Sequence, residues 1–134
     1  MEFIGKFGEY VALSRLLQHE IEAYPAIKVN QASYDITAIL ASKKVLRIQV
    51  KARELGNNST NNTLGKISEP FDFLVIVVCK KAEDAACYVL TASDVAKLQG
   101  PAKELAISSR KGGIPAVRDE LSPFLEKWDK IKAA

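Results

Sequence analysis

The amino-acid sequence predicts a single α+β (α/β) domain, spanning residues 1–134, in which helices flank a mixed β-sheet. Residues from about Ile4 to Tyr24 place apolar side chains at helical spacing. The segments Tyr34–Leu40 and Val45–Lys51 alternate polar and apolar residues with a period of two, as strands with one buried face do. Phe71–Cys79 is an almost unbroken apolar run, which is typical of a strand covered on both faces. Strands of this kind with helices before and after them favour an α+β architecture.

The N-terminal helix is expected to end before Pro25, and a short strand is expected over Ala26–Asn30. Glu9 shares the side of the helix that carries Leu13, four residues further on. Two interpretations of Glu9 stay open: a glutamate at the rim of the helix–sheet interface, or an acid that points across the sheet toward Asp35. The apolar stripe of this helix consists of Phe7, Tyr10, Val11, Leu17, Ile21 and Tyr24.

The two alternating segments are expected to form a β-hairpin through a short turn at Ala41–Lys44. One face of the second strand carries apolar side chains, and the other carries Arg47, Gln49 and Lys51. Asp35 joins Gln49 and Lys51 on one face only if the connection has an odd number of residues or a bulge corrects the register. That arrangement would bring a carboxylate, an amide and an ammonium group together, which suits metal-assisted hydrolysis of a phosphodiester.

These residues carry a family resemblance. Asp35, followed by Gln49-Val50-Lys51, resembles the D…(D/E/Q)xK signature of the PD-(D/E)XK, or restriction-endonuclease-like, nucleases. The sequence departs from the usual pattern at two positions. Tyr34 stands where the family name expects proline, and Gln49 stands where most members carry an acid.

The pair Gly8-Glu9 in the first helix resembles the Holliday-junction-resolvase branch of the same superfamily. The resemblance covers residues from about 5 to 90 and implies a restriction-endonuclease-like core of the αβββαβ type. The family usually has a helix between its third and fourth strands, where this sequence has an asparagine-rich segment. Either a turn of helix forms over Thr63–Pro70, or this chain has a shortened element there.

The resemblance implies a metal-dependent DNA endonuclease, with Mg²⁺ or Mn²⁺ held by Asp35, the side-chain oxygen of Gln49 and the Val50 carbonyl. Glu9 would hold a second metal or a water bound to it, and Lys51 would position or deprotonate the attacking water. The candidate catalytic residues are therefore Glu9, Asp35, Gln49 and Lys51. Because the Gln49 amide offers oxygen without charge, weak metal affinity is expected. DNA is the implied partner, with a homodimer as in the resolvases, and the alternative is a nuclease-like nucleic-acid-binding module that no longer cleaves.

Two polar segments are expected to be loops. Ala52–Thr63 is rich in asparagine and leaves from the strand that carries Lys51, so it either lies against a substrate or is a tolerated surface insertion. Ser108–Gly113 is either a solvated loop or a basic turn that contacts phosphate.

The C-terminal half is expected to add a strand at Ala86–Leu90 and two helices. Thr91 and Asp94 have the spacing of a capping box, which predicts a short helix over Ala92–Gln99. Ser122-Pro123 has the pattern of a helix start. The helix expected there buries a stripe made of Phe124, Trp128 and Ile131.

The composition is that of an ordinary globular protein, with 48% hydrophobic and 26% charged residues and a net charge of +3. This mild basicity permits a nucleic-acid partner without arguing for one. No signal peptide is recognisable and the longest apolar run is too short to cross a membrane, so a cytoplasmic protein with no membrane partner is expected. Cys79 and Cys87 are expected to be buried without a disulfide, and His19 is expected on the surface without a catalytic role.

Overall fold

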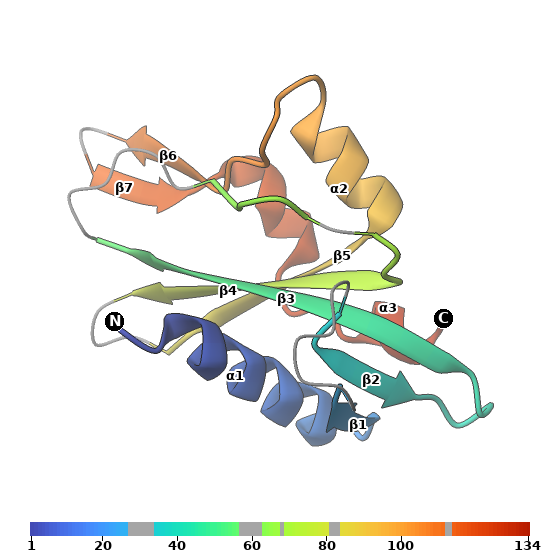
Figure 1. The fold of residues 1–134 in the computed structure, drawn as a ribbon. Coiled ribbons are helices and arrows are strands. Elements are labelled where there is room, and N and C mark those ends of the chain that lie inside the picture. Colours follow the sequence, from blue (N-terminus) through green and yellow to red (C-terminus); the bar gives the residue numbers. More distant parts are fainter. Residues whose placement is uncertain (27–33, 57–62, 68, 81–83, 112–113) are drawn as a thin grey trace.

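The computed structural model describes residues 1–26, 34–56, 63–67, 69–80, 84–111 and 114–134 (Figure 1). A five-stranded sheet has the order β1-β2-β3-β4-β5, and β6 and β7 form a separate two-stranded sheet. In the large sheet β3 and β4 are parallel, and the other neighbouring strands are antiparallel. The elements are α1 (Ile4–Gln18), β1 (Glu22–Pro25), β2 (Ile36–Ile39), β3 (Val45–Leu55), β4 (Phe73–Lys80), β5 (Ala86–Thr91), α2 (Ala92–Gln99), β6 (Ser108–Lys111), β7 (Ile114–Val117), the 3-10 helix η1 (Asp119–Phe124) and α3 (Asp129–Lys132).

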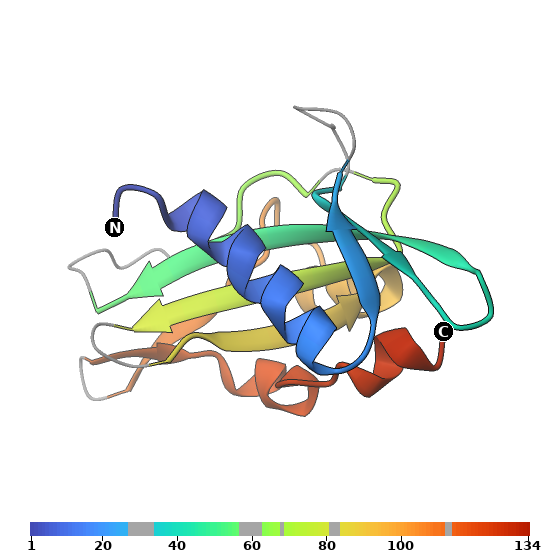
Figure 2. The same cartoon turned by 90° about the horizontal axis from the view of Figure 1, so that it is seen from below.

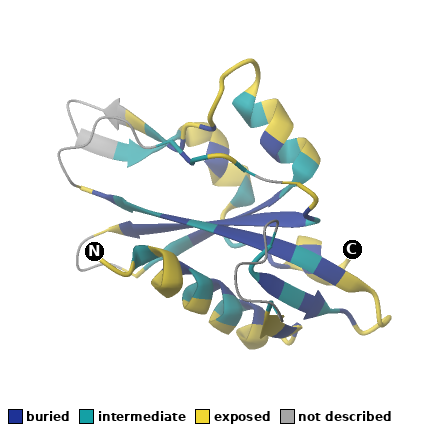
Figure 3. Cartoon of the chain, viewed as in Figure 1, coloured by how far each residue is buried: buried dark blue, intermediate teal, exposed yellow. Residues whose placement is uncertain are grey.

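The predicted fold class, a mixed sheet flanked by helices, is confirmed. Helix α1 covers one face of the sheet and α2 lies on the other side (Figures 1 and 2). Each face has its own apolar core: Ala12, Leu16 and Ile48 belong to the first, whereas Leu74 and Val95 belong to the second. Strand β4 is buried along almost its whole length (Figure 3), as its unbroken apolar run predicts.

Helix α1 approaches the sheet more closely, and through smaller residues, than the sequence predicts. Its buried residues are Gly8, Ala12 and Leu16, which recur every four positions along one face. A Cβ atom placed on Gly8 would lie 2.5 Å from the Cβ of Ala52 in β3. The predicted apolar stripe is therefore wrong in part, since Phe7, Tyr10, Leu17 and Tyr24 are exposed.

The end of α1 also differs from the prediction, because the helix stops at Gln18 and residues 22–25 form β1. The Ile21 N–H donates to the Leu16 carbonyl and the Glu20 N–H to that of Leu17, which is the Schellman arrangement. Glu20 adopts the left-handed conformation there, with φ of 60°. Glycine or asparagine usually marks this position, so the sequence carried no ordinary stop signal.

Strand β3 is longer than predicted, and its length creates the open edge on which the site is built. It continues to Leu55, so residues 52–55, predicted as loop, are strand. Antiparallel pairing with β2 ends at the Ile36–Ile48 pair, whereas pairing with β4 runs from Ile48 to Leu55. The second half of β3 therefore extends past the end of β2.

The remaining predictions have mixed outcomes. Helix α2 is confirmed with its capping box, in which the Thr91 hydroxyl accepts from the Asp94 N–H. The described residues between β3 and β4, which are 56, 63–67 and 69–72, contain no helix. The predicted strand at 26–30 and the asparagine-rich loop lie largely outside the described residues.

The C-terminal region differs more. The segment predicted as a loop at residues 108–113 contributes β6 and leads to β7, which form an antiparallel pair. The single predicted terminal helix is replaced by η1 and α3. Glu126, with φ of 52°, interrupts it and donates its N–H to the Cys87 carbonyl of β5. Trp128 and Ile131 are buried as predicted. Cys79 and Cys87 are buried and free, and His19 is exposed and stacks on Trp128.

Candidate active site

Asp35 lies at the fork where β2 ends and β3 continues. Its N–H donates to the carbonyl of Ile48, the residue that also faces Ile36, so two successive residues share one partner as in a β-bulge. Its carboxylate accepts a hydrogen bond from the Val50 N–H, with Oδ2 at 2.7 Å from the nitrogen. Because strand N–H groups lie in the plane of the sheet, the Asp35 carboxylate reaches the sheet edge, where it lines a pocket together with residues of α1.

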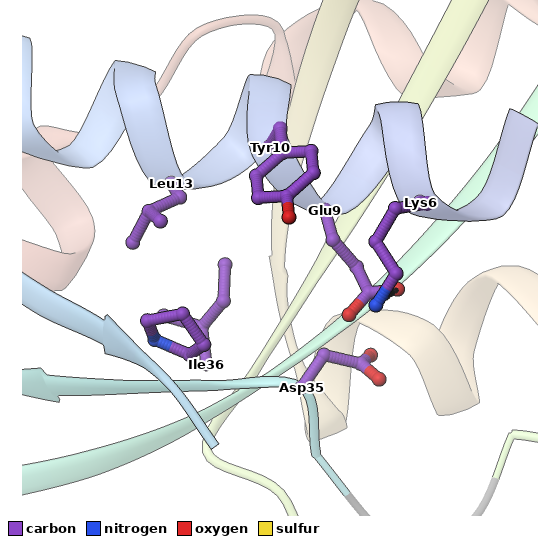
Figure 4. A pocket seen from close by; sticks show the side chains of 7 residues that line it. Lys6, Glu9, Tyr10, Leu13, Asp35 and Ile36 are labelled. Carbon is purple, nitrogen blue, oxygen red and sulfur yellow. Dashed lines mark ion pairs between the residues drawn. The ribbon is translucent and has the colours of Figure 1, made fainter. Parts of the chain in front are cut away.

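Glu9 reaches the same place from α1. Glu9 and Asp35 line a pocket of about 60 Å³, larger than the ~10–15 Å³ that one water molecule needs. Figure 4 shows the two carboxylates facing each other, with the amine of Lys6 beside them. The wall of this pocket also includes Tyr10, Leu13, Pro25 and Ile36. Of the two interpretations of Glu9, the position facing Asp35 is the one observed.

The close contact of Gly8 with Ala52 explains how Glu9 gets there. Without a side chain at Gly8, α1 can lie directly on β3, two residues along the strand from Val50. The residue after Gly8 then projects toward the fork where Asp35 lies. The Gly8-Glu9 pair therefore has a physical basis: the glycine brings the helix close, and the glutamate supplies the acid.

Gln49 and Lys51 occupy the opposite face of β3 from the α1 core, which contains Ile48 and Val50. The prediction that Asp35 shares their face is therefore wrong in detail, because the bulge places Asp35 at the edge. Lys51 nevertheless acts on Asp35, since its positive charge lowers the pKa of that carboxyl.

Gln49 is buried, with 5% of its surface exposed, and its Oε1 atom has almost no contact with solvent. It does not line the pocket between Glu9 and Asp35. The Val50 carbonyl, in contrast, points to the same side of β3 as the Val50 N–H, and therefore toward Asp35. The structure thus brings Glu9 and Asp35 together in one pocket and bonds the Val50 N–H to Asp35, whereas neither Val50 nor Gln49 lines the pocket itself.

The electrostatics of the two acids show that they are poorly neutralised. Burial, followed by repulsion from Asp35, raises the pKa of Glu9, while Lys6 lowers it. Burial also raises the pKa of Asp35, against the opposing effects of the Val50 N–H, Lys51 and Lys6. Two carboxyl groups with raised pKa values in one pocket form a site where an added cation would be stabilised.

Among the residues that the structure describes, no group of three or more His, Cys, Asp or Glu side chains is arranged to hold a metal. The donors at the fork are two carboxylates and a backbone carbonyl, which are oxygen ligands of the kind that Mg²⁺ and Mn²⁺ prefer. The chemistry of this donor set therefore fits a hard divalent cation. Lys6 was not predicted as a site residue, and the only signal was its position three residues before Glu9 on one helix face.

The chain was compared with protein families, with curated proteins and with solved structures. No family model matches the sequence, and no curated protein matches it either. Among solved structures the chain resembles a bacterial homing endonuclease, I-Ssp6803I, with a TM-score of 0.69 and 17% sequence identity. The likeness covers 99% of this chain and 91% of that one.

This likeness establishes the fold. At 17% identity it extends over nearly the whole chain, including α1 and the strands that carry the fork. In the described parts of the chain, no helix is long and apolar enough to span a membrane.

Proposed function

We propose that the chain is a metal-dependent DNA endonuclease of the PD-(D/E)XK type. The observation that carries this proposal is the pair of carboxylates, Glu9 and Asp35, that face one pocket at the open edge of β3 within the electrostatic reach of Lys51. Hydrolysis of a phosphodiester uses acids that hold a divalent cation beside a fixed positive charge. The fold shared with a homing endonuclease supports the same assignment.

In this proposal Asp35, Glu9 and the Val50 carbonyl hold Mg²⁺ or Mn²⁺, and Gln49 completes the set if its side chain turns toward the edge. When bound, the cation supplies Lewis-acid stabilisation of charge on the phosphate. Two carboxylates rather than three leave the site with modest anionic charge, so the expected metal affinity is weak. A bound cation would also offset the repulsion from Asp35 that, together with burial, raises the pKa of Glu9.

Lys51 has a separate role in the proposed chemistry. Its ammonium group offsets the negative charge that develops on the phosphate during attack, and it orients the attacking water by donating a hydrogen bond. Because an ammonium group is not a metal ligand, Lys51 is needed for hydrolysis and not for metal binding. This separation of roles gives the proposal a specific experimental signature.

The proposed partner is DNA, and a homodimer is proposed as the active form. An exposed apolar row on α1 supports self-association, because Phe3, Phe7, Tyr10 and Leu17 recur along one side of the helix, and Phe3 is 72% exposed. Light scattering on the parent and on Phe3→Ser/Tyr10→Ser tests this: loss of a dimer supports the surface, and a monomeric parent refutes it.

The second candidate function is a nuclease-like module that binds DNA without cleaving it. The observation that favours it is the uncharged Gln49 at the position where the family usually has an acid. Incubation of supercoiled, linear and branched DNA with the protein and Mg²⁺ or Mn²⁺ separates the two. Cleavage by the parent that is lost in Asp35→Asn and in Lys51→Ala supports the endonuclease. Metal-independent binding with no cleavage of any substrate supports the module.

A further inference from the structure

Lys6 lies in the first turns of α1 and shares the pocket with both acids. Its Nζ is 3.9 Å from Oε2 of Glu9, three residues further along the same helix face. Lys6 also lines the pocket opposite Asp35, so one ammonium group stands beside two carboxylates that belong to different elements (Figure 4). The Lys6 side chain is 65% exposed and that of Glu9 is 31% exposed.

The charge of Lys6 acts on both acids. It lowers the pKa of Glu9 and that of Asp35, opposing the burial that raises them. Lys6 is therefore a shared counter-ion of the pair in the described structure. An exposed Lys–Glu pair on one helix contributes little to folding stability, so stability alone does not account for a lysine facing two acids.

We infer that Lys6 competes with the divalent cation for the carboxylates of Glu9 and Asp35, and thereby sets the metal affinity of the site. This inference rests on the proposed function. A divalent ion that enters the pocket meets an ammonium group already there, and either displaces it or is repelled by it. The long flexible stem of lysine and its exposure let the ammonium group withdraw into solvent without moving α1.

The experiment is a calorimetric titration with Mn²⁺ alone, in about 0.15 M salt, where charges further away than about 8 Å are largely screened. The variants are Lys6→Met, which keeps an unbranched stem and removes the charge, and Lys6→Arg, which keeps the charge. Lys97→Met is the matched control, because it makes the same charge change on an exposed position of α2, on the other side of the sheet. Thermal melting of each variant verifies that it is folded.

Lys6→Met is expected to bind Mn²⁺ about three- to tenfold more tightly than the parent. The gain is modest because solvent weakens the interaction of the exposed Lys6 charge with the cation and the two carboxylates. Lys6→Arg and Lys97→Met are expected to bind like the parent. Equal or weaker binding by Lys6→Met, beside a parent that does bind, overturns the inference and leaves the proposed function standing. If neither the parent nor Lys6→Met binds Mn²⁺, the proposed metal site fails and the inference fails with it. Binding by Lys6→Met alone supports both.

Discussion

Replacement of Gly8 by alanine tests the contact that positions Glu9. The added Cβ would lie 2.5 Å from the Cβ of Ala52. Carbon atoms in contact are ordinarily about 3.5–4.0 Å apart, so α1 must move away from β3 by about 1 Å or more. Overpacking of this kind costs about 1–3 kcal/mol, whereas alanine in place of glycine within a helix contributes about 1 kcal/mol.

Gly5 provides the matched control, because a Cβ at that position meets nothing within 4 Å. Gly5→Ala therefore gains only the helix propensity and is expected to stabilise the protein by about 0.5–1 kcal/mol. Gly8→Ala is expected to be less stable than Gly5→Ala by about 1–3 kcal/mol. Urea unfolding followed by circular dichroism measures both free energies of unfolding.

A double-mutant cycle then identifies the contact itself. Ala52→Gly removes the atom that the new methyl group would strike, so it should recover part of the stability lost in Gly8→Ala, with a favourable coupling of about 1–2 kcal/mol. Equal stabilisation by Gly5→Ala and Gly8→Ala, or additive effects in the cycle, would refute the close packing of α1 on β3.

Three further predictions concern the site. Asp35→Asn should melt at a higher temperature than the parent at pH 7, because a raised pKa means that ionised Asp35 costs stability above that pKa. The difference should vanish near pH 3, where the acid is protonated, and calorimetric melting at both pH values checks this. Mn²⁺ affinity should fall as the pH drops through the raised pKa values of Glu9 and Asp35, and the fall should begin at a higher pH than for carboxyl groups with ordinary pKa values near 4. Constant affinity in titrations between pH 4.5 and 7.5 would contradict this. Lys51→Ala should abolish cleavage and retain Mn²⁺ binding, whereas Gln49→Glu should bind Mn²⁺ more tightly than the parent. Calorimetry measures the binding and a plasmid-nicking assay measures the cleavage. Loss of Mn²⁺ binding in Lys51→Ala, or no gain in binding in Gln49→Glu, would refute the assigned roles.

Parts of the fold that depend on strong local patterns could be predicted from the sequence. The run that became β4 is apolar because both of its faces are covered, and α2 begins at a capping box whose two hydrogen bonds are both formed. The core face of α1 could not be predicted in the same way. Phe7 and Tyr10 have the size and spacing of core residues, but the helix lies too close to the sheet for them, and Gly8 and Ala12 face it instead.

Long-range pairing explains the other differences. The terminal helix breaks because the Glu126 N–H donates a hydrogen bond to the Cys87 carbonyl in β5, and no local pattern in the sequence predicts this contact. Strands β6 and β7 have four residues each, too few for an alternating pattern to stand out. For the candidate site, the residue types at Glu9 and Asp35 could be found from the sequence, but the bulge that sets Asp35 at the sheet edge depends on tertiary pairing.

The location of a bound metal tests the central proposal most directly. Crystals of the parent protein soaked in Mn²⁺ can be measured at a wavelength where manganese scatters anomalously. The proposal predicts a peak at the fork of β2 and β3, within about 2.0–2.6 Å of oxygen atoms of Asp35 and of Glu9 or Val50. The absence of a manganese peak from this pocket in the folded protein would contradict the proposed active site, whether Mn²⁺ binds elsewhere or not at all.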